Sequence, residues 1–125
     1  THGHLGQELV AAAEMIVGDI SHIQAVSIGW HDDVNDASSD IKKRIAEVDG
    51  GGGVLILTDM FGGTPSNIAF AFHDPARVDV VTGVNLPMII KIASQKEGDT
   101  LESLAREVRD QGRSSIVMAS DFLSA

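Results

Sequence analysis

The sequence predicts an α/β protein whose open, mainly parallel sheet carries helices on both faces. Amphipathic stretches with helical spacing alternate along the chain with short apolar runs, a pattern typical of such folds. The run 54–57 (VLIL) contains no polar residue. A strand without polar alternation is covered on both faces, as in a parallel sheet between two helix layers. The 125 residues predict one domain, 1–125, with no repeat and no long linker.

The first half of the chain predicts two helices and two strands. Apolar residues recur at helical spacing over 5–17. The β-branched run 23–28 predicts a strand, although its apolar residues do not all fall on one face. A second amphipathic helix begins in the polar cluster 35–39 and ends at the glycines 50–53. The run 54–57 then predicts the central strand.

The second half predicts three helices and two strands. Because proline suits the first turn of a helix, 65–72 and 87–94 are expected to be helical. The run 78–81 predicts a buried strand between them. A last amphipathic helix is expected to end at Gly112. The apolar triplet 116–118 predicts a closing strand.

Charge and composition exclude several classes of function. With 9 Lys plus Arg and 18 Asp plus Glu the net charge is −9, and the chain has no cysteine. It lacks the basic excess that binding to a nucleic-acid backbone requires. Zero cysteines exclude a disulfide scaffold, a thiolate zinc site and a cysteine nucleophile, and favour the cytoplasm. Without a long apolar span or a signal segment, we expect no membrane insertion.

The turns after the strands are where ligands bind in an open parallel sheet, and 59–64 (DMFGGT) is the most informative of them. Gly62 and Gly63 let backbone N–H groups approach an anion, and the following helix adds its dipole. Thr64, placed before Pro65, is the expected N-cap. These residues suit a phosphate or an oxyanion. An ordinary capped glycine turn explains them too, since the stretch is neither a P-loop nor a dinucleotide fingerprint.

Asp59 follows an apolar run directly, so its carboxylate either begins a surface loop or orients a second group. His2 is the candidate partner. A carboxylate that accepts the Nδ1 proton fixes the tautomer and leaves Nε2 as a nucleophile. Asp59 then balances the charge on the ring after attack, while the Thr64 hydroxyl and the amides of 62–64 hold the transferred oxygens. This combination favours phosphoryl transfer.

Two other chemistries use nearly the same residues. A hydrolase would take Thr64 or Ser66 as nucleophile, His2 as base and Asp59 as orienter, but neither hydroxyl lies in a Gly-x-Ser-x-Gly elbow. A metal site would take His2 and His4 with Asp59, which supply only two nitrogens without a compelling ligand spacing.

Large apolar side chains near the predicted site have two interpretations. Trp30, Met60 and Phe61 suit either an exposed rim for a protein partner or core packing. His31 and the acidic residues after it predict a solvated loop.

Three ordered motifs resemble a known family. They are 1–5 (THGHL), 55–67 (LILTDMFGGTPSN) and 83–88 (GVNLPM). At these separations they resemble the mannose-family enzyme IIA domain of the bacterial phosphoenolpyruvate-dependent sugar phosphotransferase system. The resemblance covers nearly the whole chain, including 116–123.

The resemblance implies a phosphocarrier without a metal or an organic cofactor. His2 would accept a phosphoryl group at Nε2 from the phosphorylated histidine-containing phosphocarrier protein and pass it to a IIB domain for sugar uptake. Asp59 matches the acid that pairs with the histidine, and Thr64 matches a hydroxyl position beside the phosphate. The matching surroundings of the site are Met60, Phe61 and Asn85.

The resemblance further implies a homodimer in which the last strand, around 115–119, pairs with the partner's sheet. An acidic surface is compatible with docking onto a basic phosphocarrier. Family members begin with an apolar strand that ends in the Thr-His-Gly turn, which here starts at Thr1. We therefore expect that residues precede Thr1 or that another segment fills that place in the sheet.

Two other functions fit the same histidine. One is a regulatory protein controlled by phosphorylation of His2 without an associated transporter. The other is the phosphoryl-donor subunit of a dihydroxyacetone kinase, which the intact Gly-Gly-Thr-Pro turn disfavours.

Overall fold

Two parallel strands form the centre of the structure, a computed structural model that describes residues 1–29, 32–95 and 98–123. Strands β1 (Val54–Thr58) and β2 (Val78–Thr82) pair in parallel, so the expected parallel α/β sheet is confirmed. The predictions made for Trp30 and His31 lie outside the described residues.

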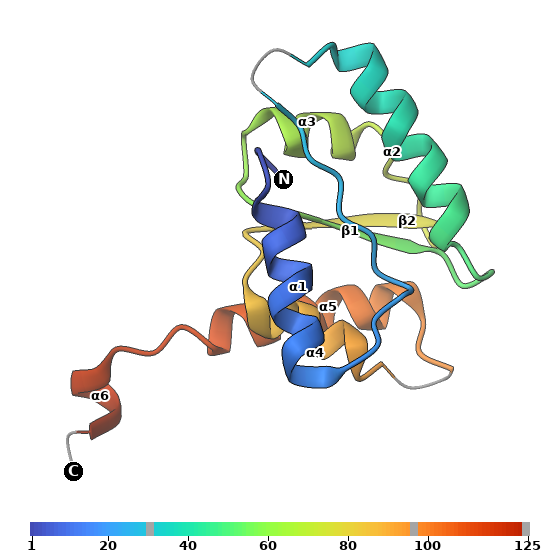
Figure 1. Ribbon diagram of the computed structural model, residues 1–125. Helices are drawn as coiled ribbons and strands as arrows, with labels where there is room; N and C mark the ends of the chain where they lie inside the picture. Colours follow the sequence, from blue (N-terminus) through green and yellow to red (C-terminus); the bar gives the residue numbers. More distant parts are fainter. Residues whose placement is uncertain (30–31, 96–97, 124–125) are drawn as a thin grey trace.

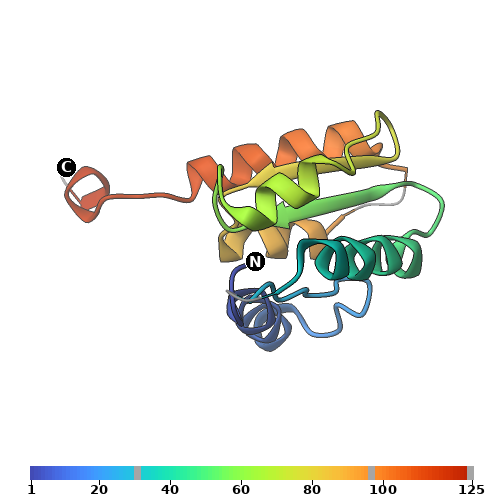
Figure 2. The same ribbon diagram turned by 90° about the horizontal axis from the view of Figure 1, so that it is seen from above.

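Helices cover both faces of this sheet (Figures 1 and 2). Ile56 of β1 packs into a cluster with Ile41 and Ile68 on one face. Leu55 packs on the other face, in a cluster that contains Leu104. Burial on both sides explains why the sequence of β1 has no polar alternation. The helices of the described chain are α1 (Leu5–Val17), α2 (Val34–Val48), α3 (Thr64–Phe70), α4 (Leu86–Ala93), α5 (Leu101–Ser114) and α6 (Ala119–Leu123).

The start of α3 differs from the prediction. Thr64 is the first helical residue, and Gly63 is the N-cap with extended backbone angles (φ −83°, ψ 166°). The expectation that Thr64 caps the helix is therefore wrong. Pro65 still lies in the first helical turn, where its missing N–H costs nothing.

Helix α5 continues past Gly112, which was expected to end it. The glycine is buried against α4: a Cβ at Gly112 would lie 2.6 Å from Met88 Sδ. Gly112 is thus required for the close approach of two helices rather than for a helix end.

The segment 23–28 is not a strand of the sheet, contrary to the prediction. It contacts the start of the chain instead: the Ile28 N–H donates to the Thr1 carbonyl over 2.9 Å, and the Gly3 N–H donates to the Ile28 carbonyl over 3.1 Å. A cavity of about 450 Å³ is lined by this segment and by β1. Within the described chain, the segment pairs only through a single bridge from Ile28 to His2 and joins neither strand of the sheet.

The predicted closing strand 116–118 is also absent from the described chain. These residues leave the body of the molecule and lead into the short helix α6 (Figure 1). Their apolar side chains are exposed. A strand needs a neighbour for its backbone hydrogen bonds, and residues 116–118 pair with neither β1 nor β2 in the described chain.

Candidate functional site

The candidate site lies at the carboxyl end of β1, where the loop into α3 meets the turn 1–4. A parallel bridge between His2 and Ile28 holds that turn in place. Figures 1 and 2 both show the N-terminus beside the loop between β1 and α3. Two side chains 57 residues apart, His2 and Asp59, come into contact there.

Asp59 binds His2 through one carboxylate oxygen. Asp59 Oδ2 lies 2.7 Å from His2 Nδ1 and accepts the His2 backbone N–H over 3.0 Å. The Asp59 side chain is 11% exposed, whereas that of His2 is 49% exposed. Because an ionised carboxylate can only accept, the short bond assigns a proton to Nδ1 and leaves Nε2 of the neutral ring with its lone pair. The ring can therefore act as a nucleophile next to a buried anion.

The Asp59 carboxyl is held in its ionised form. Burial acts to raise the pKa of Asp59, but hydrogen bonds from the His2 ring and the His2 backbone N–H outweigh it and keep the pKa below its usual range. Asp59 is thus an anion at neutral pH, as the assignment of the Nδ1 proton requires.

This lowered pKa predicts a dependence of stability on pH. An ionised Asp59 stabilises the fold fully above the pKa of an unfolded aspartate, about 3.9, and the contribution is lost as the pH falls through the lower folded-state pKa. We expect the difference in free energy of unfolding between wild type and Asp59→Asn to shrink below about pH 4. Urea titrations at several pH values measure it, and a difference that stays constant into strong acid would contradict the pKa direction.

Two glycines shape the loop around the ring. A Cβ at Gly63 would lie 2.8 Å from His2 Cε1 and 3.2 Å from Met60 Cγ. Gly62 adopts φ +84°, in the left-handed region that glycine tolerates. The glycine pair therefore allows the loop backbone to lie directly against His2.

Replacing Gly63 with alanine is expected to displace the His2 ring, because the added methyl group cannot fit at 2.8 Å. NMR should show a shifted or exchange-broadened Nδ1–H signal from the His2–Asp59 bond. Gly50→Ala is the control, since a Cβ there meets nothing within 4 Å. A wild-type Nδ1–H signal in Gly63→Ala would show that the contact is not restrictive.

Comparison with known proteins assigns the chain to a family. Residues 1–109 match the sequence model of the family described as "PTS system fructose IIA component". The chain belongs to this IIA family. The match covers both strands of the described sheet and both residues of the His2–Asp59 pair.

Relatives of this chain carry names from the same system. The mannose-specific EIIAB component of Escherichia coli K12 is 33% identical over 122 residues, which cover 90% of this chain and 36% of that protein. The fructose-specific EIIA component of Bacillus subtilis is 28% identical over 123 residues, which cover 98% of this chain and 84% of that protein. This IIA family chain thus spans 36% of the length of the EIIAB component it matches.

Solved structures of IIA proteins share its fold. The mannose/sorbose-specific IIA subunit of Enterococcus faecalis superposes with a TM-score of 0.82 at 28% identity, covering 94% of this chain and 88% of that one. EIIA from Streptococcus agalactiae reaches a TM-score of 0.84 at 22% identity, covering 96% and 93% of the two chains. At that lower identity the likeness concerns the fold.

Apolar and hydroxyl groups surround the His2–Asp59 pair in this IIA family member. Thr64 is exposed at the first position of α3. Met60 and Phe61 are also exposed, Phe61 to 75% of its surface, so the interpretation of these two residues as core is wrong. The Phe61 ring packs against Phe70 with a centroid distance of 6.1 Å. The loop therefore presents an apolar rim next to the histidine.

Asn85 has a structural place in the fold. Its Oδ1 accepts the Met88 N–H over 3.3 Å, and its Nδ2 donates to the Gly112 carbonyl over 3.1 Å. The first bond caps α4, and the second ties α4 to α5. A part for Asn85 at the site stays a prediction.

Sequence reasoning missed the pairing of two hydroxyls beneath the site, although it considered Ser66 as a nucleophile. Ser66 is fully buried, Thr58 is 2% exposed, and their hydroxyl oxygens lie 2.7 Å apart. Ser66 Oγ also donates to the Met60 carbonyl. Burial removes Ser66 from consideration as a hydrolase nucleophile. The only signal in the sequence is a hydroxyl residue at each end of the glycine turn, and a surface cap gives the same pattern.

Two further properties concern the described part of the chain. Within it, no three His, Asp or Glu side chains are grouped so that they could hold a metal ion. None of its helices combines the length and the apolar character needed to cross a membrane.

Proposed function

We propose that residues 1–125 form one IIA domain that carries a phosphoryl group on His2 in a sugar phosphotransferase system. The observation that supports this most is the 2.7 Å contact between His2 Nδ1 and Asp59 Oδ2, which leaves Nε2 of the half-exposed ring as the nucleophile. Membership of the IIA family supports the same chemistry. The domain acts in the cytoplasm, where its partner proteins would meet it.

The phosphoryl group moves between two histidines. Nε2 of His2 attacks the phosphorus of the phosphorylated histidine-containing phosphocarrier protein. The new P–Nε2 bond forms as the P–N bond of the donor breaks, and Nδ1 keeps its proton throughout. The phosphorylated ring then carries a positive charge, which the Asp59 carboxylate stabilises. A IIB domain takes the group from Nε2 by the reverse chemistry.

The glycine turn supplies donors for the oxygens of the transferred group. The backbone N–H groups of Gly62, Gly63 and Thr64 make no hydrogen bond within the described chain, so they remain available to an anion. The exposed Thr64 hydroxyl lies at the start of α3, where the helix dipole favours negative charge. Phosphoryl transfer depends mostly on such positioning and charge stabilisation.

Both partner proteins would dock on the face around His2. The exposed Met60 and the Phe61–Phe70 pair provide an apolar patch there. The net charge of −9 favours a basic phosphocarrier and speeds encounter at low ionic strength.

The test of this function is phosphorylation from phosphoenolpyruvate through the general phosphotransferase proteins. The chain should gain one acid-labile phosphate only when every protein of the relay is present, and it should lose the phosphate on addition of a IIB domain. A chain that takes no phosphate from the phosphorylated carrier contradicts the proposal.

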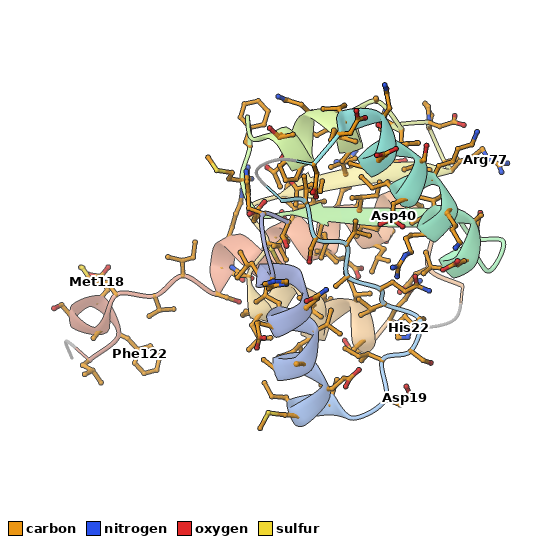
Figure 3. The ribbon with its side chains drawn as sticks, turned by 45° about the horizontal axis from the view of Figure 1, so that its top comes forward. Asp19, His22, Asp40, Arg77, Met118 and Phe122 are labelled. Atoms are coloured by element: carbon orange, nitrogen blue, oxygen red, sulfur yellow. The ribbon has the colours of Figure 1, made fainter. Side chains whose placement is uncertain are left out.

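We also propose a homodimer that is formed through the C-terminal arm, residues 116–123. The arm extends from the body, and Figure 3 shows Met118 and Phe122 on it, away from the sheet. Its large apolar residues are exposed: Ile116, Val117, Met118, Phe122 and Leu123. Beyond Val78, which bridges to Asp74, the outer edge of β2 has no strand partner in the described chain and offers hydrogen bonds to an added strand.

Sedimentation should show a dimer for the whole chain and a monomer for a chain that ends at Ser115. Pairing of 116–118 with the partner's β2 buries apolar surface that is exposed here, and truncation removes that surface. A monomeric whole chain or a dimeric truncated chain would disprove this arrangement.

A further inference from the structure

One buried hydroxyl contacts both flanks of Asp59. Ser66 Oγ lies 2.7 Å from Thr58 Oγ1, on the residue before Asp59, and bonds the carbonyl of Met60, on the residue after it. Ser66 has no exposed surface, and Thr58 is 2% exposed. Two residues that are neighbours of Asp59 in the sequence are thus tied to the same point of α3.

The directions of these hydrogen bonds follow from the groups involved. A carbonyl oxygen can only accept, so the single proton of Ser66 points to Met60. Ser66 Oγ must then accept from Thr58, whose hydroxyl donates. The carbonyl of Thr58 also accepts the Val84 N–H over 2.9 Å. The loop after β2 is therefore hydrogen-bonded to Thr58 as well.

The Asp59 carboxylate itself has few other restraints. Oδ2 takes both bonds from His2, while Oδ1 is buried and has no hydrogen-bond partner among the described residues. A side chain held through one oxygen depends on its backbone for its orientation. That backbone is the stretch between Thr58 and Met60.

We propose that the hydroxyl chain from Thr58 through Ser66 to the Met60 carbonyl positions the Asp59 carboxylate against His2. Thr58 and Ser66 are then positioning residues for phosphoryl transfer, which rests on the function proposed above. Both act through Asp59, and their burial keeps them away from the phosphate.

The first measurement examines the unphosphorylated protein and does not require the proposed function. In Ser66→Ala and in Thr58→Val, NMR should show a shifted Nδ1–H signal of His2. The pKa of Asp59 should move up toward its ordinary value as the bond from His2 weakens. Thr58→Ser keeps the hydroxyl and should lie closer to wild type than Thr58→Val. Ser94→Ala is the matched control, because it removes a hydrogen bond from an exposed serine, the C-cap of α4, to the Lys91 carbonyl.

The second measurement is the rate of phosphoryl transfer from the phosphorylated carrier. Ser66→Ala should lower kcat by about tenfold or more with little change in KM, because a misplaced carboxylate affects the reacting ring rather than docking. Adding Thr58→Val to Ser66→Ala should have no further effect, since the Thr58 bond has already lost its acceptor.

Wild-type His2 and Asp59 signals in either folded variant would overturn the proposal, as would independent effects in the double variant. If Ser66→Ala does not fold, the His2 Nδ1–H signal and the Asp59 pKa of Thr58→Val are compared with those of Thr58→Ser. Equal values in these two variants would overturn the proposal. If wild type takes no phosphate, the proposed function fails, and the NMR signals still decide whether the hydroxyl chain positions Asp59.

Discussion

Replacing His2 with glutamine is expected to abolish phosphate uptake from the phosphorylated carrier. Glutamine keeps a side chain of similar size and polarity but has no nitrogen lone pair that can attack phosphorus. The fold should persist, because the half-exposed ring contributes little to the core. Phosphorylation is measured by intact mass under neutral or alkaline conditions, which preserve phosphohistidine.

His4→Gln is the matched control for this variant. His4 lies two residues away and is exposed, and within the described chain its side chain bonds only Gln7, at 3.1 Å. We expect it to take up phosphate as wild type does. Undiminished uptake by His2→Gln, or its loss in His4→Gln alone, would place the nucleophile elsewhere.

Asp59→Asn is expected to slow the transfer while the fold is retained. The amide of asparagine carries no charge to stabilise the phosphorylated ring, and its NH₂ group can donate to Nδ1 and so select the tautomer that protonates Nε2. Loss of the orienting acid in comparable histidine systems costs about 10²- to 10⁴-fold in rate. Rapid-quench kinetics with the phosphorylated carrier measures this, and kcat should fall far more than KM changes.

The control for charge removal is Asp40→Asn on α2. Asp40 is exposed and pairs with Arg44 at 3.5 Å, away from the site (Figure 3). Asp40→Asn removes one negative charge, as Asp59→Asn does, so any general effect of net charge on docking appears in both variants. Equal kinetics for the two variants would remove Asp59 from the mechanism.

Patterns within a single element allowed most of the fold to be predicted. The apolar run of β1 correctly indicated a strand covered on both faces, and the helical spacing over 5–17 matches α1. The predictions for 23–28 and 116–118 failed because strand formation depends on a neighbour, which periodicity does not reveal. Gly112 was misassigned for a similar reason, since its packing against Met88 involves another helix.

The part of the site that was predictable from the sequence is the pair of residues whose types the proposed chemistry requires. An acid directly after a strand and a histidine in a turn were predicted to pair, and the structure brings Asp59 and His2 into contact. The support beneath them was not foreseen, because Ser66 and Thr58 meet only once α3 folds back on β1. Hydroxyl residues are common in caps and turns, so their types carried no comparable signal.

The most direct test of the account is the position of the phosphate on the wild-type protein. Nitrogen NMR of the ring, recorded after phosphorylation by the carrier, distinguishes the two nitrogens of His2. Asp59 holds Nδ1 as its hydrogen-bond donor, so the phosphate is expected on Nε2, with the Nδ1–H bond to Asp59 retained. Phosphate on Nδ1 of His2, or on any other residue, would contradict the account.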